Sequence, residues 1–203
     1  MITHVMLDVD GVLVSGHSNG EILWTSSLAQ DLGIEPDNLV GEFFSKGWLD
    51  VVTGRERLEP VLQAALDRMG ADLSAETLIA YWFENDERLV AAVIEDCQKL
   101  REAGLTILLA TNQEHCRAAY LMQDLGLERV VDGIVYSAQA GAQKPARAFF
   151  DYAMGRTGAP AGAHLLVDDT LANVDAARRV GWHGHPWTGA DRLWDVMNRY
   201  GAQ

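Results

Sequence analysis

The stretch that decides the fold is ITHVMLDVDGVL, at residues 2–13. Its first part, Ile2 to Val9, is a short run rich in apolar residues that favour β-structure, and it ends among Asp8, Asp10 and Gly11. An apolar run that stops at acidic residues and a glycine is typical of a buried strand that feeds into a loop. We therefore predict a first strand here, with two carboxylates at its carboxyl end.

From Glu87 onward, strand-like and helix-like patterns alternate. Apolar residues recur at helical spacing from Val90, and Gly104 stands where a C-terminal cap is expected. Further buried strands are predicted at 105–110, 131–137, 165–167 and 182–187, with helices between them. Such alternation forms parallel βαβ units. The sequence thus predicts an α/β fold with a doubly wound, Rossmann-like, mainly parallel sheet, in which ligands collect at the carboxyl ends of the strands.

One stretch does not fit this alternation. About 75 residues separate the first strand from the helix that leads to the second, where a crossover needs about a dozen. Helical patterns occur there at 22–32, 58–69 and 75–83, without a convincing strand. We therefore expect an α/β core of residues 1–14 plus 87–203, and a small all-helical cap subdomain of residues 15–86.

Composition excludes several classes of protein. The chain has 203 residues, 48% of them hydrophobic, and a net charge of -13, which argues against an extended nucleic-acid or anionic-membrane surface. Its two cysteines cannot form a disulfide framework or a four-cysteine zinc site. The N-terminus lacks the basic start of a signal peptide, and no apolar run approaches a membrane span. We expect a cytoplasmic protein without a nucleic-acid or membrane partner.

Polar residues gather at the predicted carboxyl ends of the strands. Two carboxylates about 4 Å apart repel by about 4 kcal/mol at an effective dielectric constant of about 20, so a cluster of them requires a cation. Oxygen ligands at an open site favour Mg²⁺. The residues of this predicted cluster are Asp8, Asp10, Thr111, Asn112, Lys144, Asp168 and Asp169.

These segments resemble the four motifs of the haloacid dehalogenase superfamily. They are DVDGVL at 8–13, TNQ at 111–113, the pair Lys144-Pro145, and Asp168-Asp169 with Asn173. They occur in the superfamily's order, and each stands at or just after a predicted strand end. The insert directly after the first motif resembles the helical cap of the phosphatase branch. The resemblance implies a phosphatase that acts on a small phosphorylated metabolite.

The resemblance also implies a role for each matching residue. Asp8 matches the nucleophile that forms an aspartyl-phosphate, and Asp10 matches the general acid and base. Thr111 and Lys144 match groups that hold the phosphoryl oxygens, and Asn112 is a further candidate for phosphate binding.

For the metal, the resemblance implies Mg²⁺ held by Asp8, the main-chain carbonyl of Asp10 and Asp169, with Asp168 nearby or bound through water. Many relatives carry glycine at the place of Asp168, so either aspartate of the pair is a candidate for the direct contact. Asn173 either orients the loop that carries Asp169 or caps the helix that follows.

Three alternatives to a phosphatase remain open. A phosphomutase uses the same framework to move a phosphoryl group to a sugar. A 2-haloacid dehalogenase lacks an aspartate at the place of Asp10 and needs no metal. A non-enzymatic phospho-receiver module also gathers acidic residues, a Thr and a Lys around Mg²⁺, but the insert and Asp10 argue against it.

The insert is rich in tryptophan. Trp24, Trp48 and Trp82 all lie in it. A helical bundle of this size needs large apolar side chains for its core, and we expect these residues to supply them. The alternative is that Trp24 or Trp48 faces the substrate.

Overall fold

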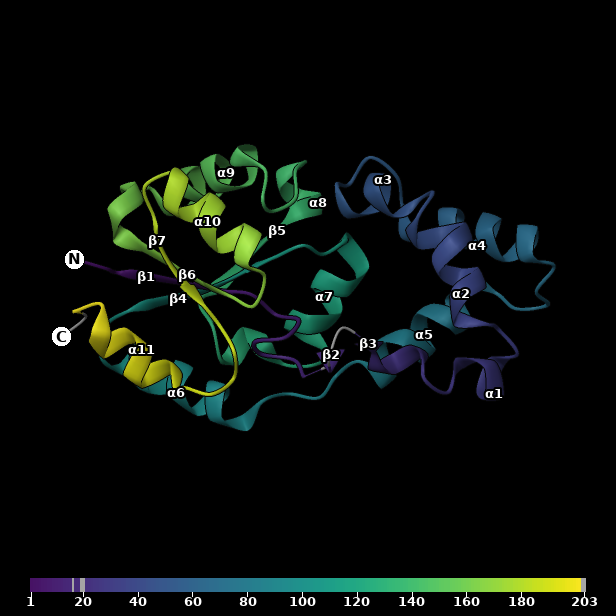
Figure 1. Cartoon of the computed structure of the whole chain (residues 1–203), viewed down its shortest axis with the longest axis horizontal. Helices are drawn as coiled ribbons and strands as arrows, with labels where there is room; N and C mark the ends of the chain where they lie inside the picture. The colour runs from purple at the N-terminus through teal and green to yellow at the C-terminus, as the bar shows by residue number, and fades with distance from the viewer. Residues whose placement is uncertain (16, 19–20, 202–203) are drawn as a thin grey trace.

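The computed structural model describes residues 1–15, 17–18 and 21–201. Five strands form one parallel sheet in the order β5-β4-β1-β6-β7, so the strand that carries the opening motif lies at the centre (Figure 1). This sheet confirms the predicted doubly wound α/β fold. Its strands are β1 (His4–Leu7), β4 (Thr106–Thr111), β5 (Gly133–Tyr136), β6 (His164–Asp168) and β7 (His183–Pro186).

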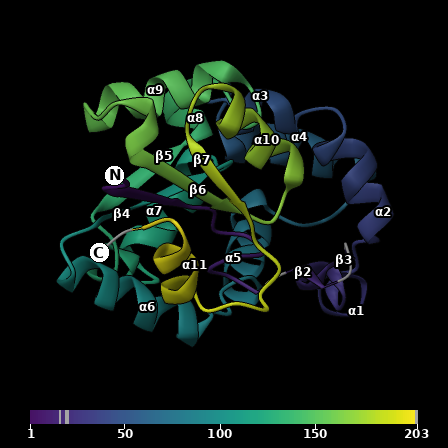
Figure 2. The same cartoon turned by 60° about the vertical axis from the view of Figure 1, so that its left-hand side comes forward.

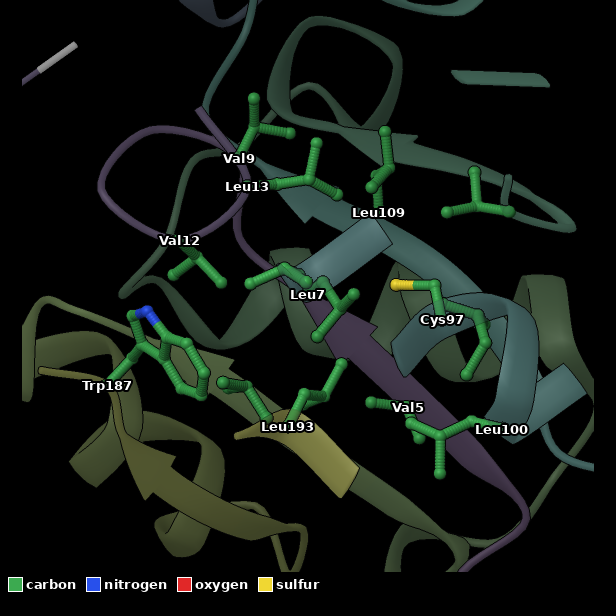
Figure 3. Close-up of a cluster of buried hydrophobic side chains, with 14 of the residues drawn as sticks. Val5, Leu7, Val9, Val12, Leu13, Cys97, Leu100, Leu109, Trp187 and Leu193 are labelled. Carbon is green, nitrogen blue, oxygen red and sulfur yellow. The ribbon is translucent and has the colours of Figure 1, made fainter. Parts of the chain in front are cut away.

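Helices cover both faces of the sheet (Figure 2). Because successive side chains of a strand point to opposite faces, Val5 and Leu7 of β1 pack into one hydrophobic core and Met6 into another. Figure 3 shows the first core, in which Cys97 and Leu193 contribute from two helices that are far apart in the sequence. The helices of this part of the chain are α6 (Ala91–Glu102), α7 (His115–Gln123), α8 (Ser137–Ala140), α9 (Arg147–Thr157), α10 (Leu171–Arg179) and α11 (Leu193–Arg199).

A separate hydrophobic core lies within the insert. It is built from residues between Trp24 and Phe83, and Figure 1 shows its helices beside the sheet rather than on it. We propose that the cap of residues 15–86 is a subdomain, because its apolar side chains pack mainly on one another. Its helices are α1 (Leu28–Leu32), α2 (Pro36–Leu39), α3 (Trp48–Val52), α4 (Leu58–Met69) and α5 (Ala75–Asn85).

The sequence located the two long cap helices and missed the short elements. The predicted helix at 58–69 is confirmed as α4, and α5 begins where expected because the Ser74 hydroxyl accepts a hydrogen bond from the Thr77 amide. Elements of one turn carry too little periodicity to be predicted, which applies to α2, α3 and the π-helical turn at Val40–Phe44.

The expectation of a strand-free insert is wrong at its beginning. Two-residue strands β2 (His17–Ser18) and β3 (Glu21–Ile22) pair antiparallel, and a 3₁₀ turn at Leu23–Thr25 precedes α1 where one helix from residue 22 was predicted. Two residues are too few to display the alternation by which strands are recognised in a sequence.

The two connections between cap and core run side by side. The Ser15 amide donates to the Arg88 carbonyl at 2.8 Å, and the Val90 amide donates to the Leu13 carbonyl at 2.9 Å. Val14 and Leu89 form an antiparallel bridge between these bonds. Within the described residues, no helix has the length and apolar character needed to cross a membrane.

Candidate active site

The parallel register of the sheet brings the predicted carboxylates together. Leu7 of β1 pairs with Val167 of β6. The residues that follow them in the chain, Asp8 and Asp168, therefore lie level with each other. The Asp8 amide donates to the Val167 carbonyl at 2.9 Å, which continues this register past the end of β1. Carboxylate oxygens of Asp8, Asp168 and Asp169 lie within 4.8 Å of one another.

Lys144 reaches this cluster from the loop after α8. Its ammonium lies 3.0 Å from Asp8 Oδ1 and 2.6 Å from Asp168 Oδ2, and all three residues are buried. Burial acts to lower the pKa of Lys144, but the two carboxylates outweigh burial and raise it. Lys144 is therefore a cation, held between the carboxylates of Asp8 and Asp168.

The cluster is short of positive charge. Asp8, Asp168 and Asp169 bring three carboxylates against one ammonium. Burial raises the pKa of Asp8 to about 7, and the carboxylates of Asp168 and Asp10 add to the rise while Lys144 opposes it. A divalent cation among these oxygens would remove the imbalance, so the residues present fit Mg²⁺.

Asn112 braces the backbone of Lys144. Its amide nitrogen donates to the Lys144 carbonyl at 3.0 Å, and its amide oxygen accepts from the Lys144 amide at 2.8 Å. Asn112 is not the N-cap of α7, because Glu114 caps that helix by accepting from the amides of Cys116 and Arg117. The amide nitrogen and oxygen of Asn112 thus both position Lys144. A contact between Asn112 and phosphate stays a prediction.

Asn173 orients Asp168. Its amide nitrogen lies 3.1 Å from both Asp168 carboxylate oxygens, and the Thr170 amide donates to Asp168 Oδ1 at 2.8 Å. The cap position of α10 belongs to Thr170, so Asn173 does not cap the helix. Because Asp168 directly precedes Asp169, these bonds favour the other predicted role of Asn173, which is to orient the loop that carries Asp169.

Asp169 is the exposed member of the acidic cluster. Its carboxylate lies directly against Gly11, where an added Cβ would overlap it. Gly11 also has φ +78°, a conformation that favours glycine. The glycine of the opening motif therefore makes room for the Asp169 carboxylate.

Asp10 is held by a residue outside the predicted set. Gln113 Nε2 donates to Asp10 Oδ2 at 2.6 Å, and Gln113 is itself buried. Gln113 belongs to the TNQ motif, but its contact with Asp10 spans 103 positions and leaves no local pattern in the sequence.

Thr111 ends β4 and is buried beside the cluster. Its hydroxyl has no hydrogen-bond partner among the described residues. A buried hydroxyl without a partner costs about 1–3 kcal/mol, so this position favours a ligand that accepts the hydrogen bond.

A cavity of about 240 Å³ opens beside Asp10, between the cap and the core. We call it the aromatic cavity; its lining residues are Asp10, Trp24, Phe44, Trp48, Trp82, Asp86, Asn112, Gln113 and Arg117. A second cavity of about 290 Å³ lies between the Gly11 loop, α6 and Asp191–Leu193. The lining of that second cavity includes none of the predicted site residues. The aromatic cavity is the one that adjoins candidate catalytic groups.

Comparison with known sequences gives consistent matches. The model of the haloacid dehalogenase-like hydrolases matches residues 2–181. A ribulose-1,5-bisphosphate 5-phosphatase of Halopiger xanaduensis is 27% identical over 197 residues, covering 89% of this chain and 82% of that protein. A phosphoglycolate phosphatase of Pseudomonas syringae is 26% identical over 183 residues, covering 87% of this chain and 66% of that protein.

Solved structures share the fold. A HAD family enzyme from Bacteroides thetaiotaomicron, in complex with magnesium and inorganic phosphate, superposes with a TM-score of 0.81 at 16% identity, covering 97% of this chain and 99% of that one. A HAD phosphatase from Thermococcus onnurineus gives a TM-score of 0.66 at 20% identity, covering 100% and 99%. At these identities the likeness shows the architecture alone.

Proposed function

The chain belongs to the haloacid dehalogenase-like hydrolases, its relatives support a phosphatase, and on this premise we propose a Mg²⁺-dependent hydrolase of small phosphorylated metabolites with Asp8 as nucleophile. The observation that carries the proposal is the buried Asp8 carboxylate, paired with Lys144 and two positions from Asp10 at the mouth of the aromatic cavity.

In the first step, an Asp8 carboxylate oxygen attacks phosphorus and the bond from phosphorus to the leaving oxygen breaks. Asp10 gives its proton to that oxygen, so the product leaves as a neutral alcohol and the phosphoryl group stays on Asp8. Lys144 and the Thr111 hydroxyl donate to the phosphoryl oxygens.

In the second step, Asp10 takes a proton from water as that water attacks phosphorus. The bond between Asp8 and phosphorus breaks, inorganic phosphate leaves, and Asp8 and protonated Asp10 are restored. Gln113 supports both steps, because its hydrogen bond keeps the Asp10 carboxyl in one place.

For the metal, we propose Asp8, Asp169 and the main-chain carbonyl of Asp10 as ligands, with Asp168 alongside. Asp168 already accepts from Lys144, Asn173 and Thr170, whereas Asp169 accepts from the neighbouring Thr170 hydroxyl. The exposed carboxylate is thus better placed for direct contact. When bound, Mg²⁺ neutralises negative charge on the phosphate, which lets a carboxylate approach it.

The test is Mg²⁺-dependent release of inorganic phosphate from p-nitrophenyl phosphate. We expect chelation of the metal and Asp8→Asn each to abolish it. Asp175→Asn, which changes an exposed carboxylate paired with Arg178 on α10, should keep wild-type turnover. Substantial Mg²⁺-dependent turnover by Asp8→Asn would exclude the mechanism. Isomerisation of a hexose phosphate without phosphate release would identify a phosphomutase instead.

A further inference from the structure

The aromatic cavity has a composition that specifies its ligand. We propose that it binds the leaving group of the substrate and selects a neutral alcohol that carries one ring. This inference rests on the proposed function, because it takes Asp10 as the donor of a proton to the leaving oxygen. It goes further by giving the chemical class of that leaving group.

Aromatic side chains form one wall of the cavity. The rings of Trp24 and Trp82 stack at 5.2 Å between centroids, Trp48 lies 5.9 Å from Trp82, and Phe44 lies 5.5 Å from Trp48. Trp24 and Trp82 are buried, while Phe44 and Trp48 are half-buried. Because the rings support one another, they offer a preorganised apolar surface on which a flat ligand loses little entropy of ordering.

The cavity has no cation to spare for an anionic leaving group. Arg117 is the one cationic residue among its described lining residues, and it is only 1% exposed. Its guanidinium pairs with the Asp86 carboxylate at 3.4 Å and donates to the carbonyls of Phe83 and Asp86. It also lies over the rings of Phe83 and Tyr120, 5.1 and 5.4 Å from their centroids. A carboxylate or second phosphate would therefore find no unpaired cation among the described lining residues of the cavity.

A cationic leaving group is no better matched. The charge of Asp86 is balanced by Arg117, and the Asp10 carboxyl already accepts a hydrogen bond from Gln113. Apart from Asp10, the charges that line the cavity therefore cancel. Aromatic faces and a balanced charge together favour an uncharged ring.

Trp82 adds one polar contact. Its indole nitrogen is buried and has no hydrogen-bond partner among the described residues. A hydroxyl or ether oxygen on the ligand would satisfy this donor. The cavity volume of about 240 Å³ has room for a single six-membered ring.

The experiment compares kcat/KM for four phosphate monoesters of primary alcohols, with Mg²⁺ present. Benzyl phosphate has a neutral ring, ethyl phosphate has none, 2-phosphoglycolate is anionic and phosphocholine is cationic. We expect benzyl phosphate to exceed each of the other three by about tenfold or more, the effect of one aromatic contact surface.

Variants then test whether the aromatic wall causes the preference. Trp48→Ala should lower the ratio of kcat/KM for benzyl to ethyl phosphate about tenfold, and Trp48→Phe should restore most of it. Trp194→Ala, which removes a partly exposed tryptophan of α11 outside the cavity, should leave the ratio unchanged. If Trp48→Ala fails to fold, Trp48→Phe and Trp82→Phe still test the wall, since each keeps an aromatic ring while changing its contacts.

The outcomes separate this inference from the proposed function. Faster turnover of 2-phosphoglycolate or phosphocholine than of benzyl phosphate overturns the inference and leaves the phosphatase intact. An equal loss on all four esters in Trp48→Ala also overturns it, because Trp48 would then be structural. If none of the esters releases phosphate in a Mg²⁺-dependent way, the proposed function fails and the inference fails with it.

Discussion

At the scale of single residues, the site is organised by groups that hold the reacting residues. Lys144 sits between Asp8 and Asp168, Asn112 braces the Lys144 backbone, and Gln113 holds Asp10. Each of these contacts restricts the position of a residue to which we assign a role in catalysis. Small losses of position at such a site translate into large losses of rate.

Gln113→Ala should lower kcat by about 10²-fold and change KM by less than about threefold, because Asp10 would lose its fixed position without loss of a phosphate ligand. Steady-state kinetics on p-nitrophenyl phosphate measures both constants. Gln113→Glu can still share a proton with Asp10, so its kcat should lie between those of the wild type and Gln113→Ala. A rise in KM at constant kcat would show instead that Gln113 binds substrate.

At the scale of elements, an ion pair between the exposed Arg192 and the buried Asp96 connects the C-terminal helix to the core. Arg192, just before α11, reaches both Asp96 oxygens of α6 at 2.9 and 2.5 Å, and the Trp194 amide donates to the same carboxylate. Burial acts to raise the pKa of Asp96, but the hydrogen bonds from Arg192 and Trp194 outweigh it and lower the pKa. Sequence patterns gave no sign of this pair, which spans 96 positions.

The lowered pKa of Asp96 predicts how stability depends on pH. The folded state favours the ionised form of Asp96. The stabilisation from this carboxylate is therefore complete above the pKa of the unfolded chain, about 4, and it is lost as pH falls through the lower pKa of the folded state. Asp96→Asn should therefore be less stable than wild type at pH 7, with the difference shrinking below about pH 4. Urea unfolding across pH measures this. A pH-independent difference would contradict the assignment, and Asp175→Asn is the surface control.

The cap also docks on the core through backbone. Gly54, after α3, lies against the Ala138 carbonyl at the start of α8, and the Ser137 hydroxyl donates to the Val52 carbonyl at 2.6 Å. An added Cβ at Gly54 would overlap that carbonyl. The close approach therefore requires glycine here.

Gly54→Ala should weaken the docking of α3 on α8 and lower kcat/KM several-fold. Gly33→Ala is a matched control, since φ is +72° at Gly54 and +69° at Gly33, but a Cβ at Gly33 meets nothing within 4 Å. Both variants should lose about 1–2 kcal/mol of stability from the left-handed conformation. Equal activity of the two variants would mean that the contact with Ala138 does not matter for turnover.

At the scale of the whole molecule, three carboxylates are clustered at the carboxyl edge of the central sheet. The net charge of -13 includes three clustered carboxylates beside one lysine, so the protein without metal stores electrostatic repulsion at its centre. Metal binding should relieve this repulsion and stabilise the fold as a whole.

Removal of Mg²⁺ should therefore lower Tm by about 5–10 °C relative to Mg²⁺ at about a hundredfold excess over its Kd. Asp169→Asn should remove most of this difference, because it deletes a proposed ligand. Asp191→Asn changes an exposed carboxylate paired with Arg199, and this variant should keep the full difference in Tm. Thermal unfolding with and without chelator measures the effect, and an undiminished shift in Asp169→Asn would place the metal elsewhere.

The sequence by itself determined the α/β class, the order of the motifs along the chain and the predicted place of the insert. These follow from local periods and from residues at strand ends, and both are visible in short windows. Asp8, Thr111 and Asp168 were predicted as neighbours for the same reason, since parallel strands share one carboxyl edge.

Only the tertiary structure decided which partners these residues have. Gln113 on Asp10, Asn112 on Lys144, Asn173 on Asp168 and the stacking of Trp24 on Trp82 are contacts between side chains whose directions depend on packing. A one-dimensional pattern says which face a residue occupies and not what stands opposite it. The residues that we propose for the chemistry were therefore predicted from the sequence, while the groups that contact them and the shape of the aromatic cavity required the fold.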